Sequence, residues 1–126
     1  MKQLFAATAL VLAGAGAAFA ADPVEGVWKT ETSDSGAFLH VKIAACGAAL
    51  CGTIAKVVNS TDTSSTGKRM IWDMEAKGGG SYSGGRIWAP DVDKTYRSKM
   101  SLNGNSLKVS GCVGPICRGQ TWTRIQ

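Results

Sequence analysis

The sequence has little of what the common catalytic and metal sites require. Histidine occurs once among 126 residues, at His40, and no G-x-S-x-G nucleophile motif is present. His40 alternates with apolar neighbours, so we expect it on the polar face of a strand and not as a general base. Asp91 and Asp93 lie in a turn sequence without the further oxygen ligands that calcium needs. The sequence therefore predicts a protein that is not an enzyme and has no catalytic residue, metal or cofactor.

Long apolar runs are also scarce. The only one extends from Leu4 to Ala18, after Lys2, and it is followed by Ala18-Phe19-Ala20. A basic start, an apolar run shorter than the roughly 20 residues of a membrane span, and an A-x-A site are typical of a cleaved export signal. We predict a signal peptide over residues 1–20 and a single domain over residues 21–126, exported to the periplasm or secreted, without a membrane span.

Charge of one sign is not concentrated anywhere in the chain. Beyond residue 20, 13 basic and nine acidic residues remain, a net charge of +4 that is spread as single Lys and Arg. No aromatic pattern for stacking on single-stranded nucleic acid accompanies the basic residues. We expect no nucleic-acid partner, and a mild preference for anionic polymers or surfaces.

The four cysteines form two equal spacings. Cys46–Cys51 and Cys112–Cys117 are both C-x4-C, with Gly inside each loop. An even number of cysteines in an exported chain indicates disulfides, and two local bridges are favoured among the three pairings that four cysteines allow. A zinc site of four thiolates is the alternative, but it commonly uses closer pairs.

The rest of the chain is predicted to be all-β. Apolar residues alternate with polar ones, as in Leu39, Val41 and Ile43, and no segment keeps helical spacing for three turns. We predict eight strands near residues 25–32, 37–46, 50–58, 69–75, 82–89, 94–102, 106–112 and 117–125. Residues 59–68 and 77–81 are expected to be mobile surface loops. Short connections favour a small eight-stranded antiparallel up-and-down barrel, with a two-sheet sandwich as the alternative.

Four segments carry a family resemblance that spans the chain after residue 20. They are EGVWKT at 25–30, LCGTI at 50–54, GRIWAPD at 85–91 with KTY at 94–96, and CRGQTWTR at 117–124. These segments resemble the DUF2147 family of exported bacterial proteins. The resemblance implies a lipocalin-like barrel, and it implies no catalytic residues because the family has no established function.

Gly26-x-Trp28 is similar to the lipocalin G-x-W signature. That similarity implies that Trp28 closes the floor of the barrel and that an arginine near the last strand packs over the indole. Arg124 is the first candidate and Arg118 the second. A guanidinium on an indole face contributes roughly 0.5–2 kcal/mol, so this role is structural.

Two functions remain open from the sequence. In the first, an exported barrel binds a small apolar or amphipathic ligand. In the second, the barrel is packed and ligand-free, and its outer face or loops bind an envelope protein or polymer. The residues that we expect to line a ligand pocket are Trp72, Arg86, Trp88, Tyr96 and Trp122, although core packing for the tryptophans and a surface position for Arg86 are alternatives.

Overall fold

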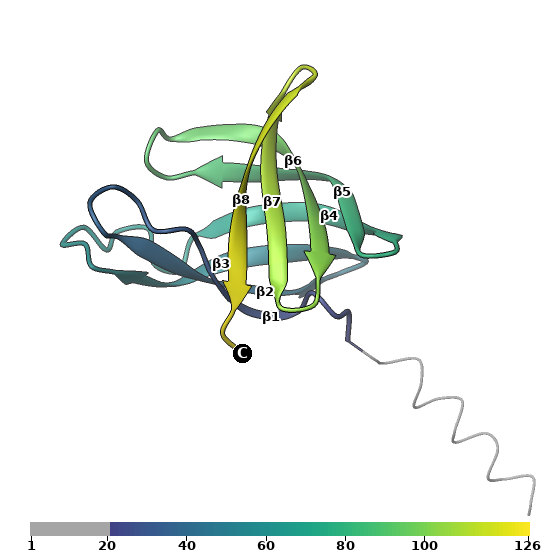
Figure 1. Cartoon of the computed structure of the whole chain (residues 1–126), viewed down its shortest axis with the longest axis horizontal. Helices are drawn as coiled ribbons and strands as arrows, with labels where there is room; N and C mark the ends of the chain where they lie inside the picture. Colours follow the sequence, from purple (N-terminus) through teal and green to yellow (C-terminus); the bar gives the residue numbers. More distant parts are fainter. Residues whose placement is uncertain (1–20) are drawn as a thin grey trace, which may run out of the picture.

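The computed structural model describes residues 21–126, and the predicted signal peptide lies outside the described part. The described chain forms eight strands that follow one another and close into a barrel (Figure 1). They are β1 (Gly26–Lys29), β2 (Phe38–Cys46), β3 (Ala49–Val58), β4 (Arg69–Gly78), β5 (Ser81–Ala89), β6 (Lys94–Asn103), β7 (Ser106–Val113) and β8 (Ile116–Arg124). Every pairing is antiparallel, including the one between β1 and β8. The predicted up-and-down barrel is confirmed, and the sandwich is excluded.

Alternation of apolar and polar residues explains where the strands form. In β7, Leu107 and Val109 are buried whereas Ser106 and Lys108 are exposed. The observed strand ends lie within three residues of the predicted ones. The strand that is shortest relative to its predicted range is β1, which ends at Lys29. At the next residue the Thr30 N–H still donates to the Leu39 carbonyl at 3.0 Å, whereas the Leu39 N–H donates to the Thr30 hydroxyl at 2.9 Å.

The two segments that were expected to be mobile loops are held by backbone hydrogen bonds. Residues 78–80 form a tight turn between β4 and β5, in which all three glycines have positive φ and Gly80 accepts from the Leu102 N–H at 2.8 Å. The longer segment of residues 59–68 returns to β3, where Ile54 bonds Gly67 and Lys68 at 2.7 and 2.9 Å. Both segments lie largely at the surface, as expected, and these hydrogen bonds anchor them to the barrel.

The barrel has two disulfides, one at each end, and each joins two adjacent strands. Cys46–Cys51 joins β2 and β3, with Cα atoms 5.9 Å apart, and Cys112–Cys117 joins β7 and β8, with Cα atoms 4.0 Å apart. Both predicted pairings are confirmed, and no cysteine is left for the zinc alternative. In the chain-entropy account, a loop of this length contributes about 2 kcal/mol to stability.

The barrel closes at a narrow seam between β1 and β8. Only Trp28 and Lys29 of β1 pair with β8, opposite Arg124 and Thr123. Trp28 is fully buried, and the guanidinium carbon of Arg124 lies 4.4 Å from the centroid of its ring. A Cβ atom on Gly26 would lie 2.3 Å from the Gln126 carbonyl oxygen, so only glycine allows this approach of the two strands.

The chain before β1 closes one end of the barrel. We call residues 22–25 the N-terminal plug. Val24 is fully buried and its carbonyl accepts the Trp28 indole N–H at 2.9 Å. Asp22 Oδ1 accepts both the Val24 N–H at 2.9 Å and the Tyr82 hydroxyl at 2.5 Å, and Tyr82 belongs to β5 on the far wall. The plug therefore joins the seam to the opposite side of the barrel.

Arg124→Ala is expected to lower the free energy of unfolding by about 2–4 kcal/mol. The variant removes the contact with Trp28 and the hydrogen bonds to the Pro23 and Glu25 carbonyls and to Asn105, at 2.6, 3.0 and 3.0 Å. Urea unfolding measures the change. Arg118→Ala is the control, since this exposed residue on the same strand should change stability by less than about 0.5 kcal/mol. Equal losses in the two variants would contradict the role of Arg124.

Tyr82 is expected to make the fold sensitive to alkali. Burial, followed by the hydrogen bond to Asp22 and the Asp22 charge, raises the pKa of Tyr82 well above its usual value of about 10. The neutral phenol is favoured in the folded state, so its contribution is complete below about pH 10 and is lost as the pH rises further.

Unfolding of wild type, Tyr82→Phe and Tyr96→Phe between pH 8 and 11 tests this. Tyr82→Phe should lose about 1–2 kcal/mol at pH 8 together with part of the alkaline slope. Tyr96→Phe is the control for removing a phenol hydroxyl elsewhere in the barrel, and an identical slope for Tyr82→Phe and wild type would contradict the prediction.

Candidate functional site: a cavity at the open end of the barrel

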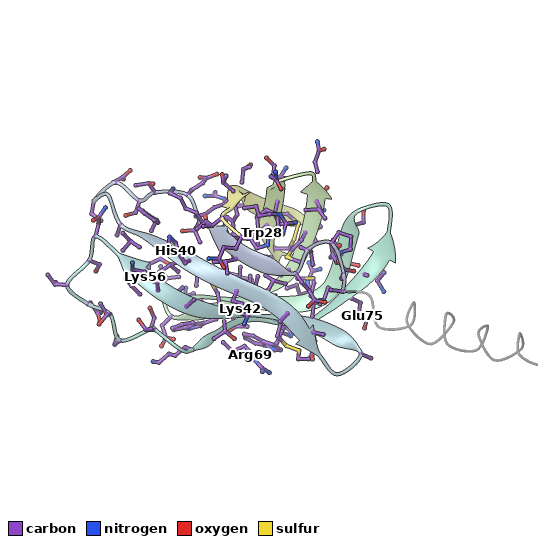
Figure 2. The ribbon with its side chains drawn as sticks, turned by 90° about the horizontal axis from the view of Figure 1, so that it is seen from below. Trp28, His40, Lys42, Lys56, Arg69 and Glu75 are labelled. Carbon is purple, nitrogen blue, oxygen red and sulfur yellow. A yellow bond between two sulfur atoms is a disulfide. The ribbon has the colours of Figure 1, made fainter. Side chains whose placement is uncertain are left out.

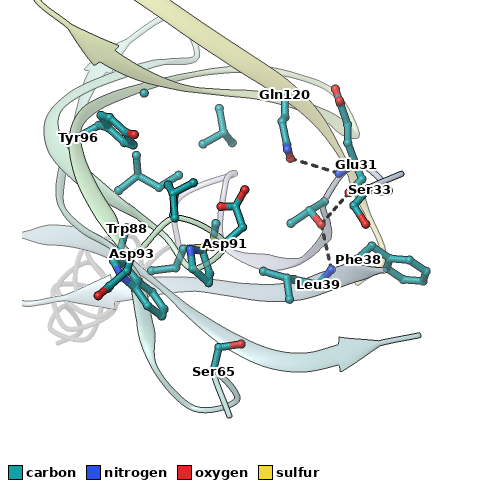
Figure 3. Close-up of a pocket in the computed structure, with 18 of the residues that line it drawn as sticks. Glu31, Ser33, Phe38, Leu39, Ser65, Trp88, Asp91, Asp93, Tyr96 and Gln120 are labelled. Atoms are coloured by element: carbon teal, nitrogen blue, oxygen red, sulfur yellow. Dashed lines mark hydrogen bonds between the residues drawn. The ribbon is translucent and has the colours of Figure 1, made fainter. Parts of the chain in front are cut away.

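A cavity of about 1090 Å³ opens at the end of the barrel opposite the N-terminal plug (Figure 3). Seven of the eight strands line it together with the segment that follows β1, because antiparallel order brings alternate starts and ends of the strands to the same rim. Its wall includes the starts of β2, β4, β6 and β8 and the ends of β3, β5 and β7. The barrel is therefore packed in one half and hollow in the other.

The inner wall of the cavity is apolar. It is formed by Leu39, Val57, Ile87, Val109 and Trp122. Trp122 is 1% exposed and belongs also to the packed core, which continues toward the plug. Trp122 thus forms the boundary between the packed half of the barrel and the cavity.

A glycine keeps part of this space free. Gly111 of β7 lines the cavity beside Ile87 and Tyr96, which pair across β5 and β6. A Cβ atom at Gly111 would lie 3.4 Å from Tyr96 Cβ and 3.5 Å from Ile87 Cγ2, which is ordinary van der Waals contact. A larger side chain would therefore enter the cavity instead of clashing with the backbone.

Side chains continue the β1–β8 seam up to the mouth. The Gln120 side-chain oxygen accepts the Glu31 N–H at 3.4 Å (Figure 3). The same oxygen accepts the Trp122 indole N–H at 3.0 Å. In return, Glu31 Oε2 accepts the Thr121 N–H at 2.7 Å. The segment after β1 is thus held to β8 at the rim without further strand pairing.

The far rim is built around Trp88 at the end of β5. Its indole N–H donates to Asp93 Oδ1 at 2.8 Å, and Lys68 Nζ lies 5.6 Å from the ring centroid. Asp62, from the segment between β3 and β4, also lies at the mouth; hydrogen bonds from the Ser64 side chain and backbone lower the pKa of this exposed carboxyl group. The lining carries four acidic side chains and two basic ones, namely Glu31, Asp62, Asp91, Asp93, Lys68 and Arg118.

Three of the five predicted pocket residues meet at this cavity. Trp88, Tyr96 and Trp122 line it, with Trp122 at the inner end and Trp88 at the rim. Trp72 and Arg86 do not line it, and the expectation is corrected for these two residues. They pair with each other across β4 and β5 on the outer side, because their chain neighbours Ile71 and Ile87 pair on the inner side.

Several residues that line the cavity were not predicted from the sequence. Gln120 shares the inner face of β8 with Trp122, two positions away, and that spacing could have indicated it. Glu31 lies beyond the end of β1, where strand alternation gives no signal. Phe38 also lines the mouth, but its ring lies outside the wall beneath Lys29, 4.3 Å from Nζ to the centroid.

His40 lies on the outer face of β2, away from the cavity. Its register partners are Lys29 on β1 and Lys56 on β3, and Lys42 follows on the same face (Figure 2). Within residues 21–126, no group of three or more His, Cys, Asp or Glu side chains gathers in a way that could hold a metal ion. The same part of the chain contains no helix that is long and apolar enough to cross a membrane.

Comparison with known proteins shows the family and the fold of the chain. The profile of DUF2147, described as an uncharacterized protein conserved in bacteria, matches residues 26–124. The chain belongs to this family. Among solved structures, protein HP1028 of Helicobacter pylori, described as a member of the lipocalin family, is similar with a TM-score of 0.68 and 16% identity, over 82% of this chain and 83% of that chain. At this identity the likeness shows a shared lipocalin-like fold. No curated protein matches the chain.

Gln120→Ala is expected to lower the free energy of unfolding by about 1–2 kcal/mol, because the buried Trp122 N–H loses its acceptor. Gln120→Glu keeps an oxygen at the same place and should retain most of the stability. Urea unfolding followed by tryptophan fluorescence measures both. Equal losses in the two variants would contradict the role of the Gln120 oxygen.

Proposed function

We propose that this DUF2147 protein binds one small apolar or amphipathic molecule in the open half of its barrel. The observation that carries the proposal is the cavity, which has an apolar inner wall and a polar mouth. Ligand pockets of proteins are commonly apolar clefts of about 300–1,000 Å³ with a few polar groups that set the orientation. The lipocalin-like fold supports the proposal further, since barrels of eight strands are wide enough to hold a small ligand.

The wall suggests how such a ligand lies. Its apolar part would contact Trp122, Ile87 and Val109, and its polar end would remain at the mouth, near Asp91 and Trp88. Four acidic and two basic side chains surround the cavity in a protein whose net charge is positive. A ligand with an uncharged or cationic polar end is therefore favoured over a carboxylate.

The proposed role is binding without catalysis, in the periplasm or outside the cell. The outward position of His40 supports the absence of acid–base chemistry in the cavity. The two disulfides support an oxidising compartment, in which they form and persist. The A-x-A sequence before Ala21 supports export by a cleaved signal peptide.

One observation favours a second candidate function, attachment to an anionic envelope polymer. β1, β2 and β3 contain no acidic residue, and their outer face carries Lys29, His40, Lys42 and Lys56 (Figure 2). A polymer bound to this outer face would leave the cavity free. The second function therefore does not require the packed, ligand-free barrel that was an alternative from the sequence.

A panel of dodecylamine, dodecanol and dodecanoate tests ligand binding by quenching of tryptophan fluorescence. We expect saturable quenching with micromolar affinity, weakest for dodecanoate. Gly111→Leu should weaken binding at least tenfold, because the side chain fills the space beside Tyr96 and Ile87. Thr121→Leu, which adds apolar bulk at an exposed position on β8, is the matched control and should bind as wild type does.

Native mass spectrometry of the protein from an oxidising compartment gives an independent check. A bound small molecule at one per chain would agree with the proposal. Absence of quenching by the whole panel, or equal binding by Gly111→Leu and wild type, would overturn it.

A further inference from the structure

A second, smaller hollow lies on the outer side of the barrel, away from the cavity. It has a volume of about 220 Å³ and is lined by parts of β5, β6 and β7. We call it the arginine groove, after Arg86 and Arg97 in its wall. Arg86, for which a pocket position and a surface position were both open from the sequence, points outward and lines this groove.

A bulge and two glycines produce the hollow. Ser83 and Gly84 of β5 together lie opposite Lys99 of β6, between the regular pairs Tyr82–Met100 and Gly85–Ser98. Gly84 has a positive φ of 83°, and a Cβ atom on Gly85 would lie 2.6 Å from the Trp72 carbonyl oxygen. The floor therefore lacks side chains at two successive positions, and a bulge leaves its extra residue without a ladder partner.

The charged side chains that line this groove are all basic. Arg86 and Arg97 are direct cross-strand partners, and Lys99 follows on the same face of β6. Like charges directly opposite each other destabilise a sheet. No acidic residue lines the groove, and in residues 21–126 the single ion pair joins Lys77 to Glu75. Beside the lining, the Glu75 carboxyl group lies about 3.7–3.9 Å from a Cβ atom built on Gly84, and it is engaged by Lys77, whose hydrogen bond lowers the pKa of Glu75.

The donors of the groove remain largely free. Arg97 donates one hydrogen bond, from Nη2 to the Gly114 carbonyl at 2.6 Å, and its remaining N–H groups have no partner in the described chain. Arg86 and Lys99 make no side-chain hydrogen bond to the described residues. Two planar guanidinium groups offer forks of paired donors, which match the oxygens of a phosphate group.

We propose that the arginine groove is an oxyanion site that binds a phosphate group through Arg86, Arg97 and Lys99. A phosphate carries up to two negative charges and several acceptor oxygens, which suit three cations around a small hollow better than a single carboxylate does. The phosphate can come from a free phosphate ester or from a phospholipid headgroup. The site is independent of the ligand cavity, because it lies on the other side of the barrel wall.

Titration with inorganic phosphate, followed by amide NMR against chloride at equal ionic strength, tests the site. We expect saturable shifts at Gly84 and Gly85 and a loss of affinity of at least tenfold in Arg86→Gln. Lys108→Gln removes one positive charge from the outer face of β7, outside the groove, and is the matched control with unchanged affinity. Gly111→Leu should also bind phosphate normally, which separates this proposal from the cavity.

Thermal unfolding adds a readout that a purely structural arginine would not give. Without phosphate, Arg86→Gln should raise Tm by a few degrees, because the repulsion between Arg86 and Arg97 is relieved. With phosphate, wild type should gain stability and Arg86→Gln should not. A lower Tm of Arg86→Gln in phosphate-free buffer, or equal phosphate binding by Arg86→Gln and Lys108→Gln, would overturn the proposal.

Two further probes distinguish the source of the phosphate. Binding of glycerol 3-phosphate without binding to vesicles of phosphatidylglycerol and phosphatidylcholine indicates a soluble ester. Arg86-dependent binding to those vesicles, but not to vesicles of phosphatidylcholine alone, indicates a headgroup. Failure of all three phosphate probes would overturn the site.

Discussion

The contact of Arg124 with Trp28 is the interaction on which the rest of the structure depends. A barrel needs its last strand to return to its first, and here β1 provides four residues, of which two pair with β8. Backbone pairing of that extent is a weak closure. The guanidinium compensates by contacting the indole and two carbonyls of the plug at the same time. Closure, the buried plug and the position of β8 at the mouth are therefore coupled through one side chain.

The interior of the closed barrel has two unlike halves, which meet at Trp122. Below Trp122, the large side chains of Trp28, Ile54, Met74 and Leu107 fill the interior and are essentially inaccessible to solvent. Above it, Gly111, Gly119 and Ala37 line a space that no side chain of residues 21–126 fills. A domain of about 106 residues has limited apolar surface to bury. Because the core is concentrated at the closed end, the open end stays hollow.

Much of the fold was predictable because it rests on local rules. Alternation located all eight strands, and the short cysteine loops indicated both bridges. The face that each residue takes was harder to predict, because bulges shift the alternation. β4 and β5 each contain an irregular register, which changes the face that the following residues take. As a result Trp72 and Arg86 point outward, whereas Ile87 and its partner Tyr96 line the cavity.

The residues at the mouth of the cavity were also only partly predictable from the sequence. Trp88, Tyr96 and Trp122 were indicated by their chemistry alone, since large aromatic residues are frequent at apolar pockets. Glu31 reaches Thr121 across 90 positions of sequence, and no local pattern encodes that distance. Contacts of this kind appear only once the barrel has closed.

The closed end also determines how the molecule can be handled. The Gln126 carbonyl accepts the Val27 N–H at 3.0 Å, so the carboxyl terminus lies beside the start of β1, away from the β7–β8 turn (Figure 1). A fusion partner or a solid support joined after Gln126 therefore lies at the closed end of the barrel and leaves the cavity at the other end unobstructed. Molecules attached to a surface through Gln126 would form an oriented layer in which every open barrel end faces the solution.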